Sequence, residues 1–319
     1  MSGKPVIVVA ALALFGLVRW PLEEAATKDF RARRVLAPQA GLSLRERLTQ
    51  NSYAGVLGGA RSLVASLEEL AAFSAFENDD WGQVESRYRL VTDLQPNVPA
   101  YWDMGSNLLA YSGSSYFRYD WPGPKGETNP ASVMRVRLEL YDRYVRKGRD
   151  MLDEGIRNNP RSWKLLTAAA QCWFDPWRSP DAAKAADFYR RAAAVPGAPA
   201  RMLRRLGAGA LSCVPGREDE ARAELQALYD ENEQNRTPNV VCTLLDFQLA
   251  AGVPQEKRVP FSEIARNPSE LLQELFDYAA ARRFRKCDIS PQMFEIISRL
   301  EDQVGLPPEK RLSPPVQKP

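Results

Sequence analysis

The sequence contains no histidine. This absence excludes catalysis by Ser-His-Asp and Cys-His groups, zinc hydrolysis at HExxH sites and general-base catalysis by imidazole. An enzyme built on this chain would depend on carboxylates, Lys, Tyr or Cys. The 319 residues are enough for one large domain or two ordinary ones.

Cysteine is scarce, and no two cysteines form a CxxC pair. Both the spacing of zinc ligands and the thioredoxin motif are therefore missing. An even number of cysteines permits two disulfides in an oxidising compartment, but a chain of this length does not need such crosslinks to fold. We therefore expect free, buried thiols at the four positions, which are Cys172, Cys213, Cys242 and Cys287.

The net charge is also small, because 43 Lys and Arg stand against 40 Asp and Glu and give +3. This is too near neutral for a protein that binds a polyanion. The basic cluster Arg282–Lys286 lies at the end of a predicted helix, where cations complement the helix dipole, so a nucleic-acid patch is the minor interpretation. Gly55, Gly58 and Gly59 lack the preceding strand and the GK[ST] motif of a phosphate-binding loop. We expect no nucleic acid, nucleotide, metal or other cofactor.

A single long apolar run, Val6–Val18, lies near the N-terminus, with Lys4 before it and Arg19-Trp20-Pro21 after it. Its 13 residues match the length of a signal peptide and are slightly short for a spanning helix, which normally needs about 17 to 25. No small-x-small cleavage site follows the run directly. We therefore expect residues 5–20 to form an uncleaved membrane anchor, within a segment 1–36, rather than a buried core helix or a removed signal.

The charges around this anchor leave its orientation open. Arg19, Lys28 and three further arginines follow the run, whereas Lys4 and the amino group precede it. The positive-inside rule would place the body of the protein in the cytoplasm. The short, signal-like segment before the run favours export of the body instead.

Helical patterning dominates the chain from Ser43 onward, and no run of alternating β-branched and aromatic residues is long enough for a sheet. Ser43-Leu44-Arg45-Glu46 matches a capping box, in which Ser and Glu satisfy the first backbone donors of a helix. Further helix starts are predicted at Asp79-Asp80 before Trp81, at Asn267 before Pro268 and at Ser290 before Pro291. The predicted fold class is all-α.

Helix-pair repeats are also predicted. The tetratricopeptide (TPR) pattern has W-x2-L-G-x2-Y in a first helix, A-x3-F in a second and Pro after it, over about 34 residues. Partial matches occur in order, with small residues where paired helices would approach closely: they are Tyr101-x2-Met104-Gly105-x2-Leu108, Trp163-x2-Leu166, Ala185-x3-Tyr189, Leu203-x2-Leu206-Gly207 and Ala221-x3-Leu225. We expect a right-handed α-solenoid of TPR-like helix pairs over residues 37–252, with an irregular helical bundle as the alternative.

Other segments depart from the repeat pattern. Residues 112–133 are rich in aromatics, Gly and Pro, and predict a long loop that is either functional or a cover over a groove. Residues 253–305 predict a C-terminal helical cap with helices over 269–284 and 291–304. The proline-rich tail 306–319 is expected to be extended and mobile.

Several segments point to a relationship: they are the anchor, Leu44–Leu48, Gly59–Ala65, Asp79–Trp81, Leu94–Pro96 and Tyr101–Gly105. In that order they resemble N-terminally anchored TPR proteins of Gram-negative-type bacteria that have no assigned activity. The resemblance covers roughly residues 5–230. It implies a membrane-tethered helical-repeat scaffold at the bacterial inner membrane, with a single-pass anchor, and it supplies no catalytic residues.

The predicted function is therefore a non-enzymatic scaffold that binds a protein or peptide in a bacterial cell envelope. The alternative is a carboxylate-dependent hydrolase acting on glycans, which needs two carboxyl groups about 5 to 10 Å apart across a cleft. The acidic pairs Glu23-Glu24, Glu68-Glu69 and Asp79-Asp80 do not meet this need, because neighbours on a helix point in different directions. We interpret the last pair as a helix cap and the other two as solvated faces.

A partner-binding surface is predicted on the first helices, next to the Leu-Gly step of the TPR pattern. Lys and Arg at such places would hold a terminal carboxylate of a peptide. For the cations near position 204 the alternative is a solvated helix face, and for Trp102 it is packing in the seam between helices. The predicted contact residues are Trp102, Lys164, Gln171, Arg201 and Arg204.

Overall fold

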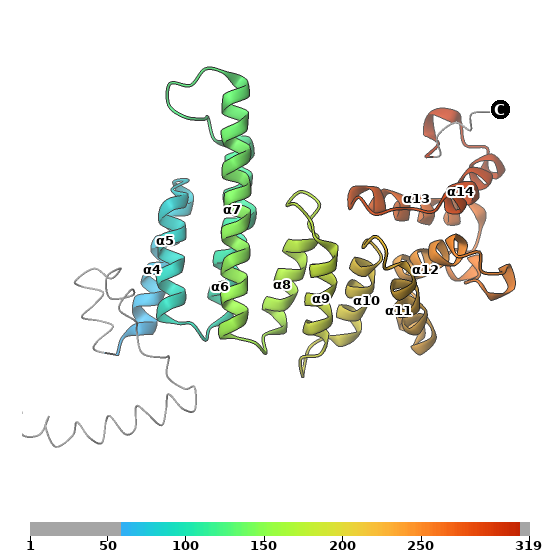
Figure 1. Ribbon diagram of the computed structural model, residues 1–319, viewed down its shortest axis with the longest axis horizontal. Coiled ribbons are helices and arrows are strands. Elements are labelled where there is room, and N and C mark those ends of the chain that lie inside the picture. Colours follow the sequence, from blue (N-terminus) through green and yellow to red (C-terminus); the bar gives the residue numbers. More distant parts are fainter. Residues whose placement is uncertain (1–58, 313–319) are drawn as a thin grey trace, which may run out of the picture. The chain divides into compact units, whose positions relative to one another are not determined.

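A computed structural model describes residues 59–312, which are helical or irregular throughout and contain no strand (Figure 1). The all-α prediction is confirmed for this part of the chain. The chain divides into two compact units, Met1–Gly105 and Ser106–Pro319. The predicted anchor, the capping box at Ser43 and the last seven residues of the tail lie outside the described residues. Within 59–312, no helix combines the length and apolar character that crossing a membrane requires.

The first unit is described from residue 59 and contains the helix pair α4 (Arg61–Glu77) and α5 (Trp81–Leu94). As predicted, Asp80 caps α5, because its carboxylate accepts the Gln83 N–H at 3.1 Å. The buried core of the pair includes Ala65 and Leu94. Glu68 is not a solvated residue: its carboxylate is half-buried and lies 2.7 Å from the guanidinium of Arg87, which ties α4 to α5.

Helix α6 (Pro99–Asn107) crosses the boundary between the units and continues through two π-helical segments, η1 (Leu108–Gly113) and η2 (Tyr116–Asp120). The long helix α7 begins at Pro130 and ends at Asn158. The prediction of a loop over 112–133 is therefore wrong, since only residues 121–129 are irregular. A π turn bonds residue i to i+5, so it shifts the side chains out of the 3.6-residue period that marks a helix in sequence.

Four helices follow in series, each packed on the next: α8 (Trp163–Phe174), α9 (Ala182–Ala193), α10 (Ala200–Leu211) and α11 (Glu218–Glu231). Several residues of the repeat pattern are buried, among them Tyr189 and Leu203, whereas Met104 and Leu206 of the same pattern are 42% and 39% exposed. A Cβ added at Gly207 would lie 3.3 Å from the Cβ of Tyr189, so glycine permits the close approach of α9 and α10. Helices thus pack in pairs, as the repeat pattern predicted.

The C-terminal part contains α12 (Pro238–Ala250), α13 (Pro268–Phe284) and α14 (Pro291–Val304). Asn267 and Ser290 cap the last two helices at the predicted places. One hydrophobic core runs from α10 to α14, so the predicted boundary at 252/253 falls inside a continuous core. Short 3-10 turns connect the elements: they are Glu233–Asn235, Gln255–Lys257, Phe261–Glu263 and Pro308–Lys310.

Residues 306–312 of the predicted tail pack back on α14. The Leu312 N–H donates to the carboxylate of Glu301 at 2.6 Å, and Arg311 lies 2.7 Å from Asp302. The expectation of an extended, mobile tail is therefore wrong for these residues, because two side chains of α14 bind this stretch of chain. The rest of the tail, 313–319, lies beyond the described part.

The cysteine prediction holds for two of the four residues. Cys172 and Cys242 are free and buried, as expected. Cys213 and Cys287 form a disulfide with their Cα atoms 4.8 Å apart, which corrects the expectation of free thiols. The turn after α10 and the turn after α13 bring these two residues together although 74 positions separate them in sequence.

Candidate functional site

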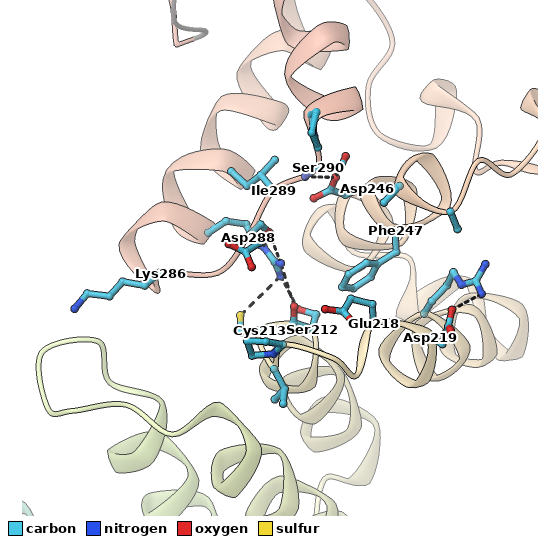
Figure 2. A pocket seen from close by; sticks show the side chains of 17 residues that line it. Ser212, Cys213, Glu218, Asp219, Asp246, Phe247, Lys286, Asp288, Ile289 and Ser290 are labelled. Atoms are coloured by element: carbon cyan, nitrogen blue, oxygen red, sulfur yellow. Dashed lines mark hydrogen bonds and ion pairs between the residues drawn. The ribbon is translucent and has the colours of Figure 1, made fainter.

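A cavity of about 400 Å³ lies among α10, α11, α12 and the turn between α13 and α14 (Figure 2). The turn after α10 forms one wall and the turn before α14 forms the opposite wall. The lining mixes apolar and charged side chains, among them Pro215, Glu218, Asp246, Phe247, Arg282, Lys286, Ile289 and Ser290.

Arg282, near the end of α13, connects the two walls. Only 6% of the residue is exposed, and its guanidinium donates to the Ser212 hydroxyl at 2.7 Å and to the Ser212 carbonyl at 3.0 Å. The same group donates to the Asp288 carbonyl at 3.0 Å. We interpreted this arginine from the sequence as part of a basic helix end, but it is a buried link between two turns.

Asp246, on α12, satisfies a second buried network. Its carboxylate accepts the Tyr278 hydroxyl at 2.6 Å and the Ser290 N–H at 3.1 Å, and the Ser290 hydroxyl also donates to it. Burial, together with the charge of Asp246, raises the pKa of Tyr278 well above its ordinary value, so the phenol stays protonated and remains a donor. Three donors thus bind the carboxylate of Asp246, which links α12 to α13 and to the start of α14.

The disulfide lies at the edge of this cavity. Cys213 is half-buried and lines the cavity, whereas Cys287 is buried at 7% exposure. A guanidinium nitrogen of Arg282 lies 3.8 Å from the Cys213 sulfur (Figure 2). Sequence reasoning missed both the disulfide and the cavity, because neither leaves a local signal when the partners are 74 residues apart.

The charged groups at the rim are mostly paired. Asp219 lies 2.7 Å from Arg222, and Glu218 accepts the Gly216 N–H at 2.9 Å. That backbone hydrogen bond lowers the pKa of Glu218, so the carboxyl is ionised near neutral pH. Residues 59–312 contain no group of three or more Cys, Asp or Glu side chains that could hold a metal ion. The lining thus combines an apolar side chain, Phe247, with charged groups at the rim.

The five predicted contact residues have different surroundings in the structure. Trp102 belongs to the first unit, is 3% exposed and donates its indole N–H to the Pro96 carbonyl at 2.9 Å, which supports the alternative of seam packing. Lys164 and Gln171 are exposed on α8 and lie two turns apart on one face. Neither of them lines the cavity of Figure 2.

Arg201 and Arg204 are exposed on α10, but both contact the end of α11 and the turn after it. Arg204 lies 2.7 Å from the carboxylate of Glu231, and Arg201 donates to Gln234. Arg204 also lines a second cavity, which it shares with residues of α9 and α11. Arg204 therefore lies against α9 and α11, which are the second helices of the predicted pairs. Its guanidinium forms an ion pair with Glu231 of the same chain.

No protein-family model matches this chain, and no curated protein shows significant similarity to it. A proposed function therefore depends on the geometry described above.

Proposed function

We propose that this chain is a membrane-tethered, TPR-like helical-repeat scaffold that binds a protein partner in a bacterial cell envelope. In this proposal α8 to α11 are two consecutive units of a right-handed α-solenoid. The supporting observation is the serial packing of these helices with small and aromatic residues between them, in particular Gly207 against Tyr189. Helix pairs stacked in this way present extended surfaces for partners.

Exposed aromatic side chains support a protein partner in particular. Trp177 and Phe284 are 57% and 53% exposed, and their rings meet edge to face at 5.9 Å. Tryptophan and arginine are enriched among the residues that dominate binding energy at protein interfaces. Arg285, one residue beyond α13, stacks on Phe174 and adds a cation to the same surface.

In the first unit, α4 exposes a row of apolar side chains. Leu63, Leu67 and Leu70 are 57% to 66% exposed and lie three to four residues apart, on one face of the helix. Contiguous apolar surface of this kind marks interaction sites in soluble proteins. It supports partner binding by this unit independently of the aromatic pair in the second unit.

The disulfide supports an exported body. Disulfides persist in oxidising compartments such as the periplasm and are rare in the cytosol. Cys213–Cys287 therefore favours the orientation in which the anchor, residues 5–20, holds the helical body on the periplasmic side of the inner membrane. The competing inference from the positive-inside rule predicts reduced thiols.

The hydrolase alternative has less support. It needs a carboxylic acid with a raised pKa facing a second carboxylate across a cleft. In the cavity of Figure 2, the pKa of Glu218 is lowered, and the carboxylate of Asp246 accepts hydrogen bonds from Tyr278 and Ser290. Burial raises the pKa of Asp153, but this residue belongs to α7 and does not line the cavity.

The anchor is tested by fractionation. We expect the full-length chain to sediment with membranes and a chain without residues 1–36 to remain in solution. A full-length chain that is found in the soluble fraction, or a mature N-terminus just after Trp20 in mass spectra, would contradict the tether.

The binding surface is tested by crosslinking in membranes, followed by purification of the crosslinked partner. We expect Lys164→Ala combined with Arg204→Ala to weaken partner capture by about 1.5 to 3 kcal/mol, the scale of charge-assisted hydrogen bonds. Arg191→Ala is the matched control, because Arg191 is an exposed cation paired with Asp187 on the neighbouring helix α9. Unchanged capture by the double variant would remove these two residues from the surface.

A further inference from the structure

The two cysteines of the disulfide differ in their surroundings. Cys213 is half-buried and lines the cavity of about 400 Å³, whereas Cys287 is not part of that lining and is 7% exposed. A thiolate that enters the cavity therefore meets the Cys213 side of the disulfide. Thiol–disulfide exchange requires this kind of access to one sulfur of the bond.

A buried cation also lies beside the accessible sulfur. The guanidinium of Arg282 approaches Cys213 Sγ at 3.8 Å and is held there by hydrogen bonds to Ser212 and Asp288. Asp288 accepts from this guanidinium through its backbone carbonyl, and no carboxylate of the cavity lining forms an ion pair with Arg282. A thiolate formed on Cys213 would thus lie next to a fixed positive charge, which makes Cys213 a good leaving group in exchange.

From this arrangement we propose that Cys213–Cys287 is a thiol–disulfide exchange site, which oxidises a pair of cysteines in a polypeptide segment seated in the adjacent cavity. The proposal goes beyond the scaffold role and does not depend on it. The apolar part of the lining, Pro215, Phe247 and Ile289, would hold side chains next to the reacting cysteine of the segment.

The exchange has two steps. A thiolate of the segment attacks Cys213 Sγ, the S–S bond breaks, and Cys287 leaves and takes up a proton. The second thiolate of the segment then attacks the segment's own sulfur in the mixed disulfide, and Cys213 leaves as a thiolate beside Arg282. The segment loses two electrons and two protons; the Cys213–Cys287 pair gains both electrons and one proton, on Cys287, and the other proton passes to water.

The first measurement uses the full-length protein in detergent. The oxidised protein is mixed at neutral pH with a reduced synthetic peptide that contains two cysteines and an aromatic residue, and thiols on both molecules are counted by mass spectrometry. We expect one peptide disulfide to form for each protein disulfide lost, while circular dichroism shows an unchanged helix content. A protein that keeps its disulfide under these conditions, or loses it only on unfolding, would overturn the proposal.

The second measurement compares two variants that both lack the disulfide. In Cys287→Ser the remaining thiol is Cys213, which lines the cavity, and in Cys213→Ser it is Cys287, which is buried. Because both variants lose the same disulfide, we expect a similar loss of stability in each. Each is treated with 5,5′-dithiobis(2-nitrobenzoic acid), and we expect Cys287→Ser to react at least about tenfold faster, as access and a neighbouring cation predict. Equal rates would show that Cys213 has no special reactivity. Adding Arg282→Gln to Cys287→Ser should remove most of the difference.

Discussion

At Gly148, α7 closely approaches the end of α6 and η1. A Cβ added there would lie 2.5 Å from the Cβ of Ala110 and 2.7 Å from the carbonyl oxygen of Ser106. Because both are closer than real Cβ contacts, the two segments would have to separate. We expect Gly148→Ala to lower the free energy of unfolding by about 1 to 3 kcal/mol, the usual cost of overpacking.

Gly209 provides the matched control for this prediction. It also lies inside a helix, α10, but an added Cβ would meet only the side-chain nitrogen of Asn239 at 3.8 Å. Because alanine is the better helix former, Gly209→Ala should be neutral or stabilising by up to about 1 kcal/mol. Urea unfolding followed by circular dichroism measures both changes. Equal effects at the two positions would mean that the close approach of α7 and η1 is not what requires glycine.

A second prediction at this scale concerns the two free thiols. Cys172 and Cys242 are buried, and burial raises the pKa of both thiols, that of Cys242 to about 12. Because the thiolate is the reactive form, neither residue should be alkylated by iodoacetamide at pH 8 in the native protein. Mass spectrometry should find two labels after unfolding without reductant and four after reduction. A native protein that is labelled at Cys242 would contradict this burial.

At the scale of elements, the loop between α8 and α9 is fastened by buried arginines. Arg178 donates from Nε to the Ala110 carbonyl of η1 at 2.8 Å, and its guanidinium stacks on the ring of Tyr111 at 4.0 Å. Arg149 of α7 donates to the Arg178 carbonyl and, at 3.3 Å, to the Ser179 carbonyl, and both of these residues lie in the loop. The loop is therefore bound to the two helical segments before it.

We expect Arg178→Met to destabilise the protein by about 3 kcal/mol, because it leaves a buried carbonyl without its donor and removes a buried charged hydrogen bond. Hydrogen exchange should accelerate most in residues 174–181. Arg191→Met serves as control, since the Arg191–Asp187 pair is about half exposed and such surface pairs contribute about 0 to 1 kcal/mol. A uniform change in exchange over the whole unit would argue against a local fastening.

These elements also show how far sequence reasoning reaches. The helix starts at Trp81, Pro268 and Pro291 were predictable, because each depends on a cap and a first turn within four residues. The continuation of the helix through 112–120 was not, because its π turns conceal the helical period. The site was invisible for a different reason: Arg282, Cys213 and Cys287 meet only in three dimensions.

At the scale of the whole molecule, both units keep tyrosine hydroxyls in their cores. Tyr88 in the first unit and Tyr189 and Tyr278 in the second are buried, and Tyr111 in the second is half-buried. Burial raises the pKa of Tyr189 from its ordinary value of 10.0 to about 12, and it raises the other three as well. An unfolded chain therefore releases these protons at lower pH than the native protein does.

The sign of the pH dependence follows from this difference. Below pH 10 the phenols are protonated in both the native and the unfolded state, so they do not change the free energy of unfolding with pH. Above pH 10 the unfolded state loses these protons first, which favours unfolding. Tyr189 alone should lower the free energy of unfolding by about 1 kcal/mol between pH 10 and pH 11, since each pKa unit corresponds to about 1.4 kcal/mol and the effect is only partly developed at pH 10. Urea unfolding at pH 9, 10 and 11 measures this decline. Tyr189→Phe keeps the ring and removes the ionisable group, so the stability of this variant should decline less with pH. An unchanged decline would show that the pKa of Tyr189 is not raised in the native protein.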